Sequence, residues 1–308
     1  MTSSRLGRFL AICLAASAAS SAQAQSSIPD SETTAEPIIV TPNAVENDAT
    51  ISNAVRKIAP RLDRDNPITR FMDSLCLAVA GSDMETGSAI HRMITDRALE
   101  IGIDEEGEGC RPNALVIVTR DPEKLISALR RSQPRLFNAA ANRTSDSGIE
   151  NADAAIVWST TEPRSQSGLK LRNSPILPGM NPTGASGPMP FSAAINSDAK
   201  ARRLGSNLSR AVVNAVVILD ARRLTGLTLR QISDYAAMRI FAAPQPVVPQ
   251  IPPPRSILGL FEKSSAPPAM EMTAFDRAYL DGLYDLPINA AGTALTASVL
   301  EAYREQAD

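Results

Sequence analysis

The sequence predicts an α+β fold in which a mixed sheet is covered by helices and one disulfide bond joins Cys76 to Cys110. Short apolar segments suited to buried strands alternate with segments whose apolar residues recur every three or four positions, as on one face of a helix. Only these two cysteines follow the predicted export signal, and two cysteines in an exported chain most simply form a disulfide. The 44% hydrophobic and 21% charged residues are typical of a globular protein.

Residues 1–24 have the three parts of a secretory signal peptide. Arg5 and Arg8 form a cationic start, residues 9–16 form an apolar run, and Ala22-Gln23-Ala24 matches the small-x-small cleavage pattern. The apolar run is shorter than the roughly 20 residues that a transmembrane anchor requires. We therefore expect cleavage near Ala24 and a periplasmic or secreted mature protein.

Residues 25–66 are rich in Ser, Pro, Asp, Glu, Asn and Thr and lack periodicity, so we expect a disordered leader. One β-prone island, residues 36–41 (Glu-Pro-Ile-Ile-Val-Thr), interrupts it. This island resembles the TonB box, the short segment of outer-membrane receptors that adds a strand to a periplasmic partner. The alternative is a short extended piece that docks on its own domain or on nothing.

A single α+β domain is expected over residues 67–308. Its first part alternates strands and helices, expected at 75–80, 85–101, 115–119 and 121–131. An acidic loop at 104–109 leads to Cys110, so a Cys76–Cys110 bond would tie the first strand to the entrance of the second. The alternatives for the two cysteines are separate buried thiols or a shared metal site.

The second part of the domain opens with a strand at 154–161 and a loose insertion, rich in Pro, Ser and Gly, at about 162–208. Further elements are expected as an apolar strand at 211–219, a helix at 228–242, a Pro-rich linker at 244–254, a short turn or helix at 256–261, a helix from Thr273 and a final helix at 293–305. Thr228 with Gln231, and Thr273 with Asp276, have the spacing of helix N-caps. Leu229, Ile232, Ala236 and Ile240 form the face of helix 228–242 that we expect to pack on the sheet.

Composition excludes several classes of function. The formal net charge of −2 argues against a nucleic-acid-binding protein, which needs a basic face. His91 is the single histidine, so a histidine-dominated zinc site cannot form. A Ser-His-acid triad would have to be built on His91, which we expect to be an ordinary helical residue. We predict no catalytic residue, cofactor or metal ligand.

Two weaker sequence patterns have the spacing of known catalytic or metal-binding groups. Ser197 and Lys200 match the Ser-x-x-Lys spacing of penicillin-recognising enzymes, but the companion motifs are missing from the sequence. Asp104, Glu105, Glu106 and Glu108 could hold calcium, but they lack the alternation of an EF-hand loop. We therefore interpret the first pattern as coincidental and the second as a solvated acidic loop.

The second half of the domain resembles a metzincin-type metalloprotease in its order of elements. An apolar strand, the capped helix 228–242, a Pro-rich link, residues 256–261 and the helix at 273–284 correspond to the zinc helix, Met-turn and C-terminal helix of that family. Where the family has His-Glu-x-x-His-x-x-Gly-x-x-His, this chain has Arg230-Gln231-Ile232-Ser233-Asp234-Tyr235. The resemblance implies a zincin-like scaffold without its metal. The chain as a whole also resembles a group of uncharacterised exported bacterial proteins.

These observations favour an exported, non-catalytic binding or envelope-associated module with an unknown protein partner in the envelope. Such a module should show an exposed apolar patch or sheet edge. The alternative is a hydrolase with a degenerate, metal-free zincin-like site, in which Asp234, Tyr235 and a second carboxylate converge in a pocket. In the non-catalytic case we expect Asp234 to be a solvated charge on the side of its helix that faces away from the sheet.

Overall fold

A computed structural model of the chain describes residues 46–59, 62, 66–134, 150–152, 154–175, 192–200, 206–242, 254–262 and 267–306. These residues belong to one unit, 45–308. The predicted signal peptide, the segment at 36–41 and nearly all of the Pro-rich linker at 244–254 lie outside the described residues.

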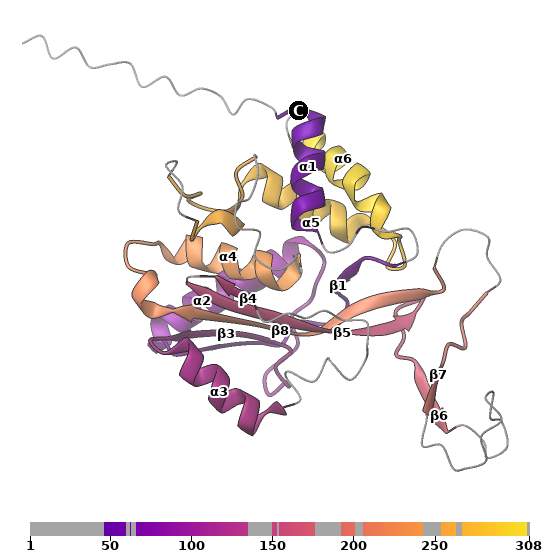
Figure 1. Ribbon diagram of the computed structural model, residues 1–308, viewed down its shortest axis with the longest axis horizontal. Helices are drawn as coiled ribbons and strands as arrows, with labels where there is room; N and C mark the ends of the chain where they lie inside the picture. Colours follow the sequence, from indigo (N-terminus) through magenta and orange to yellow (C-terminus); the bar gives the residue numbers. More distant parts are fainter. Residues whose placement is uncertain are drawn as a thin grey trace, which may run out of the picture. The chain divides into compact units, whose positions relative to one another are not determined.

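The central strand of the sheet is β8 (Leu208–Asp220), which pairs along both of its edges. On one edge it runs parallel to β1 (Thr69–Phe71) and, further along, to β3 (Ala114–Thr119). On the other edge it runs antiparallel to β5 (Ala155–Ser165) over its whole length. The sheet is completed by β2 (Leu77–Ala80), parallel to β3, and β4 (Glu150–Ala152), antiparallel to β5 (Figure 1). The sheet is therefore mixed, as predicted.

Side chains of β8 alternate between two hydrophobic cores on the two faces of the sheet. Val216 and Ile218 pack in a small core with Ile126 of α3 (Pro122–Ser132). Val217 and Leu219 belong to the larger core, which includes residues of α2 (Met84–Glu100) and α4 (Leu229–Phe241). Because β8 is buried on both faces, it has to be apolar on both, which explains the apolar run from Ala215 to Leu219.

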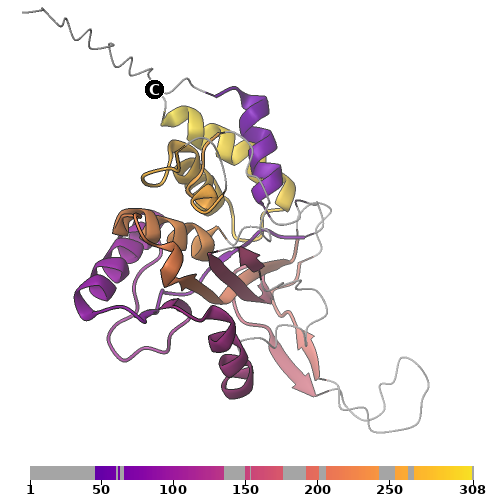
Figure 2. The same cartoon turned by 60° about the vertical axis from the view of Figure 1, so that its left-hand side comes forward.

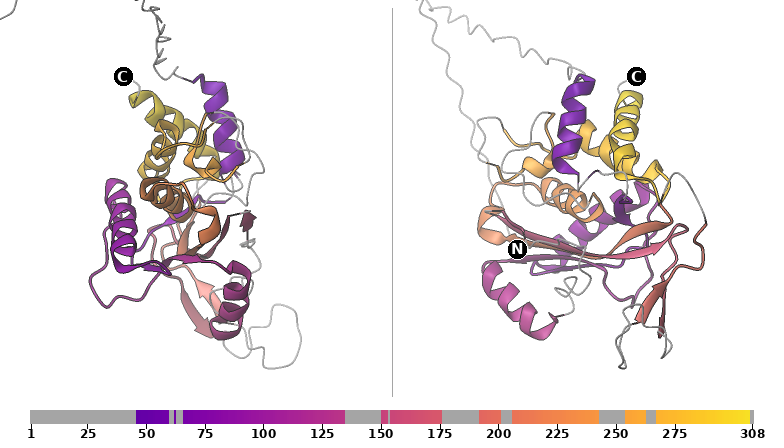
Figure 3. Two further views of the ribbon diagram at one scale, coloured as in Figure 1. Left: turned by 90° about the vertical axis from the view of Figure 1, so that its left-hand side faces the viewer. Right: turned by 45° about the vertical axis from the view of Figure 1, so that its right-hand side comes forward.

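Three helices form a further layer beyond α4 (Figure 3): α1 (Asp48–Ile58), α5 (Ala274–Asp285) and α6 (Leu295–Glu305). α6 packs against both α1 and α5. Arg70 of β1 joins this layer to the sheet, because its guanidinium donates to the carbonyl oxygens of Leu283 at 2.8 Å and Leu286 at 2.7 Å. These carbonyls at the end of α5 would otherwise lack an intrahelical partner.

A separate two-stranded antiparallel sheet projects from the far ends of β5 and β8 (Figure 2). It consists of β6 (Arg172–Pro175) and β7 (Ser192–Ile195), and Arg172 pairs with Ile195. We call residues 166–207 the arm. The sequence predicted a loose insertion at 162–208, and this expectation is wrong for β6, β7 and the last residues of β5.

The expected helices and strands of the remaining domain are present, with both helix caps. Thr228 and Thr273 each form a capping box, with Gln231 and Asp276 respectively. Short 3-10 turns lie at η3 (Ala221–Arg223), η4 (Ile257–Gly259) and η5 (Gly292–Ala294). No helix within the described residues is both long and apolar enough to cross a membrane.

Two details of the expected organisation need correction. Helix α1 lies within the predicted leader 25–66, and its buried residues, among them Ile51 and Val55, belong to the larger core. Helix α4 is buried from Gln231 to Phe241, so it does not have one core face and one solvated face. Of the four residues expected on its sheet face, Ile232, Ala236 and Ile240 are buried, whereas Leu229 is 37% exposed.

The predicted disulfide is present between Cys76 and Cys110, whose Cα atoms lie 6.0 Å apart. Asn113 reinforces this connection, since its side-chain oxygen accepts from the Cys76 amide at 2.8 Å and its nitrogen donates to the Ser74 carbonyl at 2.8 Å. The acidic loop is thereby fixed to the start of β2 on both sides.

We predict that replacing Cys76 and Cys110 together by Ser lowers the free energy of unfolding by about 3–4 kcal/mol, the entropy cost of opening a loop of this length. Urea unfolding of the oxidised protein and of the double variant measures the difference. Reduced wild-type protein is the control and should match the variant. Equal unfolding midpoints for the oxidised protein and the variant would contradict the prediction.

Candidate functional site

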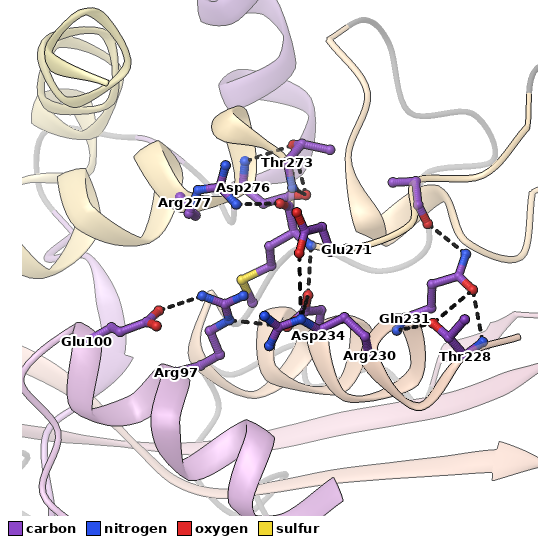
Figure 4. A network of polar contacts seen from close by, with 12 residues as sticks. Arg97, Glu100, Thr228, Arg230, Gln231, Asp234, Glu271, Thr273, Asp276 and Arg277 are labelled. Carbon is purple, nitrogen blue, oxygen red and sulfur yellow. Dashed lines mark hydrogen bonds and ion pairs between the residues drawn. The ribbon is translucent and has the colours of Figure 1, made fainter. Parts of the chain in front are cut away.

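Asp234 of α4 lies at the centre of a buried polar network (Figure 4). It is 0% exposed. Its Oδ1 accepts from Nε of Arg97 in α2 at 3.2 Å, and its Oδ2 accepts from the Met272 amide at 2.8 Å. Both oxygens are therefore engaged, and the carboxylate joins α2, α4 and the segment before α5.

The expectation of a solvated Asp234 is wrong. A buried ionised carboxylate is tolerated where a charged partner and hydrogen bonds compensate its lost hydration, and Arg97 and Met272 supply both. The burial of Asp234 could not be predicted from the neighbouring sequence, because its partner Arg97 lies 137 residues away in the chain.

Tyr235, the second group of the hydrolase alternative, makes different contacts. Its ring packs edge-on against Phe261 with the centroids 4.9 Å apart, and its hydroxyl accepts from Nε of Arg239 at 3.2 Å. The nearby carboxylate of Glu271 is half exposed and lies 3.6 Å from Nε of Arg230. Arg230 Nε also lies 3.9 Å from Asp234 Oδ2, so the two carboxylates share this arginine. The Tyr235 hydroxyl contacts a different arginine.

Gln231 holds the same segment over the start of α4. Its side-chain oxygen accepts from the Thr228 amide at 3.0 Å, and its side-chain nitrogen donates to the Ala269 carbonyl at 2.8 Å. Together with the bond from Met272 to Asp234, this contact fixes residues 269–272 against the first two turns of α4. The network orders a segment without regular structure.

Asp276 forms a second buried carboxylate centre at the start of α5. It is 0% exposed, its Oδ1 accepts from the Ser256 hydroxyl at 2.5 Å, and its Oδ2 accepts from the amides of Ile257 at 2.8 Å and Thr273 at 2.9 Å. Burial raises the pKa of the Asp276 carboxyl, while these hydrogen bonds favour the ionised form and oppose the shift. Asp276 therefore satisfies the N-terminal amides of both η4 and α5.

The other sequence-derived candidates lie apart from one another. His91 is half exposed, with its Nε2 atom 3.4 Å from Glu105 Oε1. Ser197 and Lys200 lie in and just after a turn, so they do not share a helical face. Among the residues that the structure describes, no group of three or more His, Cys, Asp or Glu side chains could hold a metal ion.

Arg164 of β5, which is only 4% exposed, lies where the arm joins the domain. We call this junction, formed by residues 162–172, 195–200 and 206–209, the neck of the arm. The Arg164 guanidinium binds both carboxylate oxygens of Asp73, at 2.7 and 2.6 Å, and Nε donates to Glu162 at 2.9 Å. The hydrogen bond from Arg164 lowers the pKa of the Asp73 carboxyl. A partly buried two-pronged ion pair thus fixes the end of β5 to the loop after β1.

A second cluster anchors the arm where its two chain segments meet. Asp198 Oδ2 accepts from the hydroxyls of Ser165 at 2.9 Å and Ser167 at 2.5 Å. Asn196 donates to the Asn207 carbonyl at 2.7 Å across the same neck. The chain therefore leaves and re-enters the domain through a hydrogen-bonded junction.

The segments that this junction holds together carry exposed side chains. We define the arm patch as three apolar and three cationic residues, all in the arm except Leu208, the first residue of β8 directly after it: Leu169, Ile195, Leu208, Lys170, Arg172 and Lys200. Leu208 pairs with Ser165 across the sheet, and Ser165 also hydrogen-bonds to Leu169, so the patch is a local feature of the neck. These residues could not be recognised from the sequence, because their proximity depends on the pairing of β5 with β8 and of β6 with β7.

No known protein family, curated protein or solved structure matches this chain. The mixed α+β fold and the disulfide therefore rest on the structure itself, and the zincin-like part of the expected fold is not confirmed.

We predict that Asp234→Ala lowers the free energy of unfolding by about 3–5 kcal/mol, because it removes the buried partner of the Arg97 guanidinium and leaves the Met272 amide without its acceptor. Glu100→Ala is the matched control: Glu100 contacts the same guanidinium at 2.7 Å but is half exposed. That exposed contact should be worth at most about 1 kcal/mol. Urea unfolding of the two variants checks the ranking, and a similar small loss for both would contradict the assigned role of Asp234.

We also predict a pH dependence that originates at Asp276. Since burial raises its pKa in the folded state, its contribution to stability is greatest below the unfolded value of about 3.9 and falls as the pH rises through the folded pKa. Asp276→Asn has nearly the same shape and does not titrate. The stability of wild type minus that of this variant, measured by urea unfolding at several pH values, should decrease with pH. A difference that is constant or rises with pH would refute the prediction.

Proposed function

We propose that this protein is an exported, non-catalytic module that associates with a component of the cell envelope through the arm patch. The observation that carries the proposal is the neck of the arm, where Leu169 and Ile195 are 63% and 47% exposed on segments fixed by partly buried polar contacts. Contiguous exposed apolar patches are typical of interaction surfaces.

The buried network around α4 supports a structural role for the groups that a hydrolase would use. A carboxylate that acts as a general base must reach the proton that it removes. Asp234 and Asp276 are both 0% exposed and use both oxygens in hydrogen bonds. Access by a substrate to either would require the surrounding helices to separate.

The disulfide supports the proposed location outside the cytoplasm. Disulfides persist in oxidising compartments, and Cys76–Cys110 joins two segments of the folded domain. This agrees with the signal peptide that the sequence predicts over residues 1–24.

The proposal is tested by replacing Leu169, Ile195 and Leu208 together by Ser in the full chain. We expect the fraction retained with the envelope, relative to the soluble extracytoplasmic fraction, to fall on the order of tenfold or more, because contacts of apolar side chains are lost. Quantitative immunoblots of the two fractions measure this ratio, and thermal denaturation verifies that the variant folds.

The matched control replaces Met84, Leu99 and Leu229 by Ser, three exposed apolar side chains on other elements. This control should be retained like wild type. Equal retention of the arm-patch variant and wild type would refute the proposed function, as would equal losses for the arm-patch variant and the control.

A further inference from the structure

The arm differs in charge from the rest of the chain. Residues 166–207 contain five cationic residues and one acidic residue, a net charge of 5 − 1 = +4. The whole chain has a net charge of −2, so the remaining residues carry −2 − 4 = −6. Positive charge is therefore concentrated in one segment of the sequence of an otherwise acidic protein.

The described part of the arm presents this charge to solvent. Lys170, Arg172 and Lys200 are exposed, and none of them belongs to a salt bridge within 4.0 Å among the described residues. Lys170 and Lys200 interact electrostatically with Asp73 and Asp198 respectively, and Arg172 has no such carboxylate neighbour among the described residues. Asp198, the acidic residue of the arm, is half-buried and accepts hydrogen bonds from Ser165 and Ser167. The arm patch thus combines exposed cations with exposed Leu and Ile side chains.

We propose that the arm patch binds the surface of a bilayer that contains anionic lipids. This inference rests on the proposed function and names the class of its partner. Cationic side chains are attracted to anionic headgroups, and neighbouring apolar side chains gain free energy on entering the boundary of the acyl chains. The complementarity lies in the arm, because the acidic remainder of the chain would be repelled.

A second group of exposed cations, on and beside α3, is less suited to bind a bilayer than the arm patch. Arg120, Lys124 and Arg131 are exposed on or beside α3. Asp121 and Glu123 lie among them, and none of the exposed large apolar side chains of the described residues belongs to α3. That surface offers charge of both signs and no apolar group to insert.

The neck gives the arm a fixed geometry for such contact. Arg164 is held by Asp73, and Asn196 is hydrogen-bonded to Asn207, so both segments of the patch are attached to the ends of β5 and β8. β6 and β7, which carry Arg172 and Ile195 of the patch, extend beyond the six-stranded sheet (Figure 2).

Cosedimentation of the purified, oxidised full chain with lipid vesicles tests the proposal. We expect binding to vesicles of equimolar phosphatidylcholine and phosphatidylglycerol, little binding to pure phosphatidylcholine, and release at high ionic strength. Replacing Lys170, Arg172 and Lys200 together by Gln should lower the partition coefficient on the order of 100-fold, from the contribution of three basic residues at an anionic surface.

Two further variants make the result specific. Replacement of Arg120, Lys124 and Arg131 by Gln changes the net charge equally and should leave most of the binding intact. Leu169→Ser with Ile195→Ser keeps the charge and should weaken binding severalfold. Absence of vesicle binding, equal binding to both kinds of vesicle, or equal losses for the two Gln variants would overturn the proposal.

The failure of this inference can be distinguished from failure of the proposed function. If the arm-patch Ser variant is released from the envelope but the wild-type chain ignores phosphatidylglycerol vesicles, the module binds a protein and the lipid proposal is wrong. If neither experiment depends on the arm patch, both proposals are wrong.

Discussion

The pairing of β8 along both edges is the constraint on which the arrangement of the domain depends. Its first residues are parallel to β1, its later residues are parallel to β3, and β5 accompanies it antiparallel throughout. Its side chains alternate between a small core under α3 and a large core under α4. One strand thereby fixes the positions of the helical layers on both faces of the sheet. The arm extends from the end of its antiparallel pair with β5.

Two buried carboxylates organise the part of the domain that has little regular structure. Asp234 holds the segment before α5 against α4, and Asp276 joins η4 to α5. In both cases an acid supplies hydrogen-bond acceptors to backbone amides that would otherwise be buried without partners. The polar residues that resemble an enzyme site in sequence thus act as connectors, and the exposed apolar residues of the arm patch lie elsewhere.

Local patterns predicted much of this fold. The spacing of Thr228 with Gln231 gave a capping box, and the apolar run before it gave β8. The burial of Asp234 could not be predicted, because it depends on Arg97 in a distant helix. Helix α1 was missed for a related reason. Its polar sequence resembles a leader, and the burial of its apolar face depends on contact with α6, which is distant in sequence. The arm patch likewise depends on strand pairing, which composition does not reveal.

The packing of α1 against α6 has a consequence for the order of folding. Ile51 and Val55 share a core with Val299, and Arg304 forms an ion pair with Asp48. Contacts between residues so distant in sequence form slowly, since a long loop must close before they contribute free energy. The first helix of the domain therefore lacks its docking surface until the last helix has been synthesised.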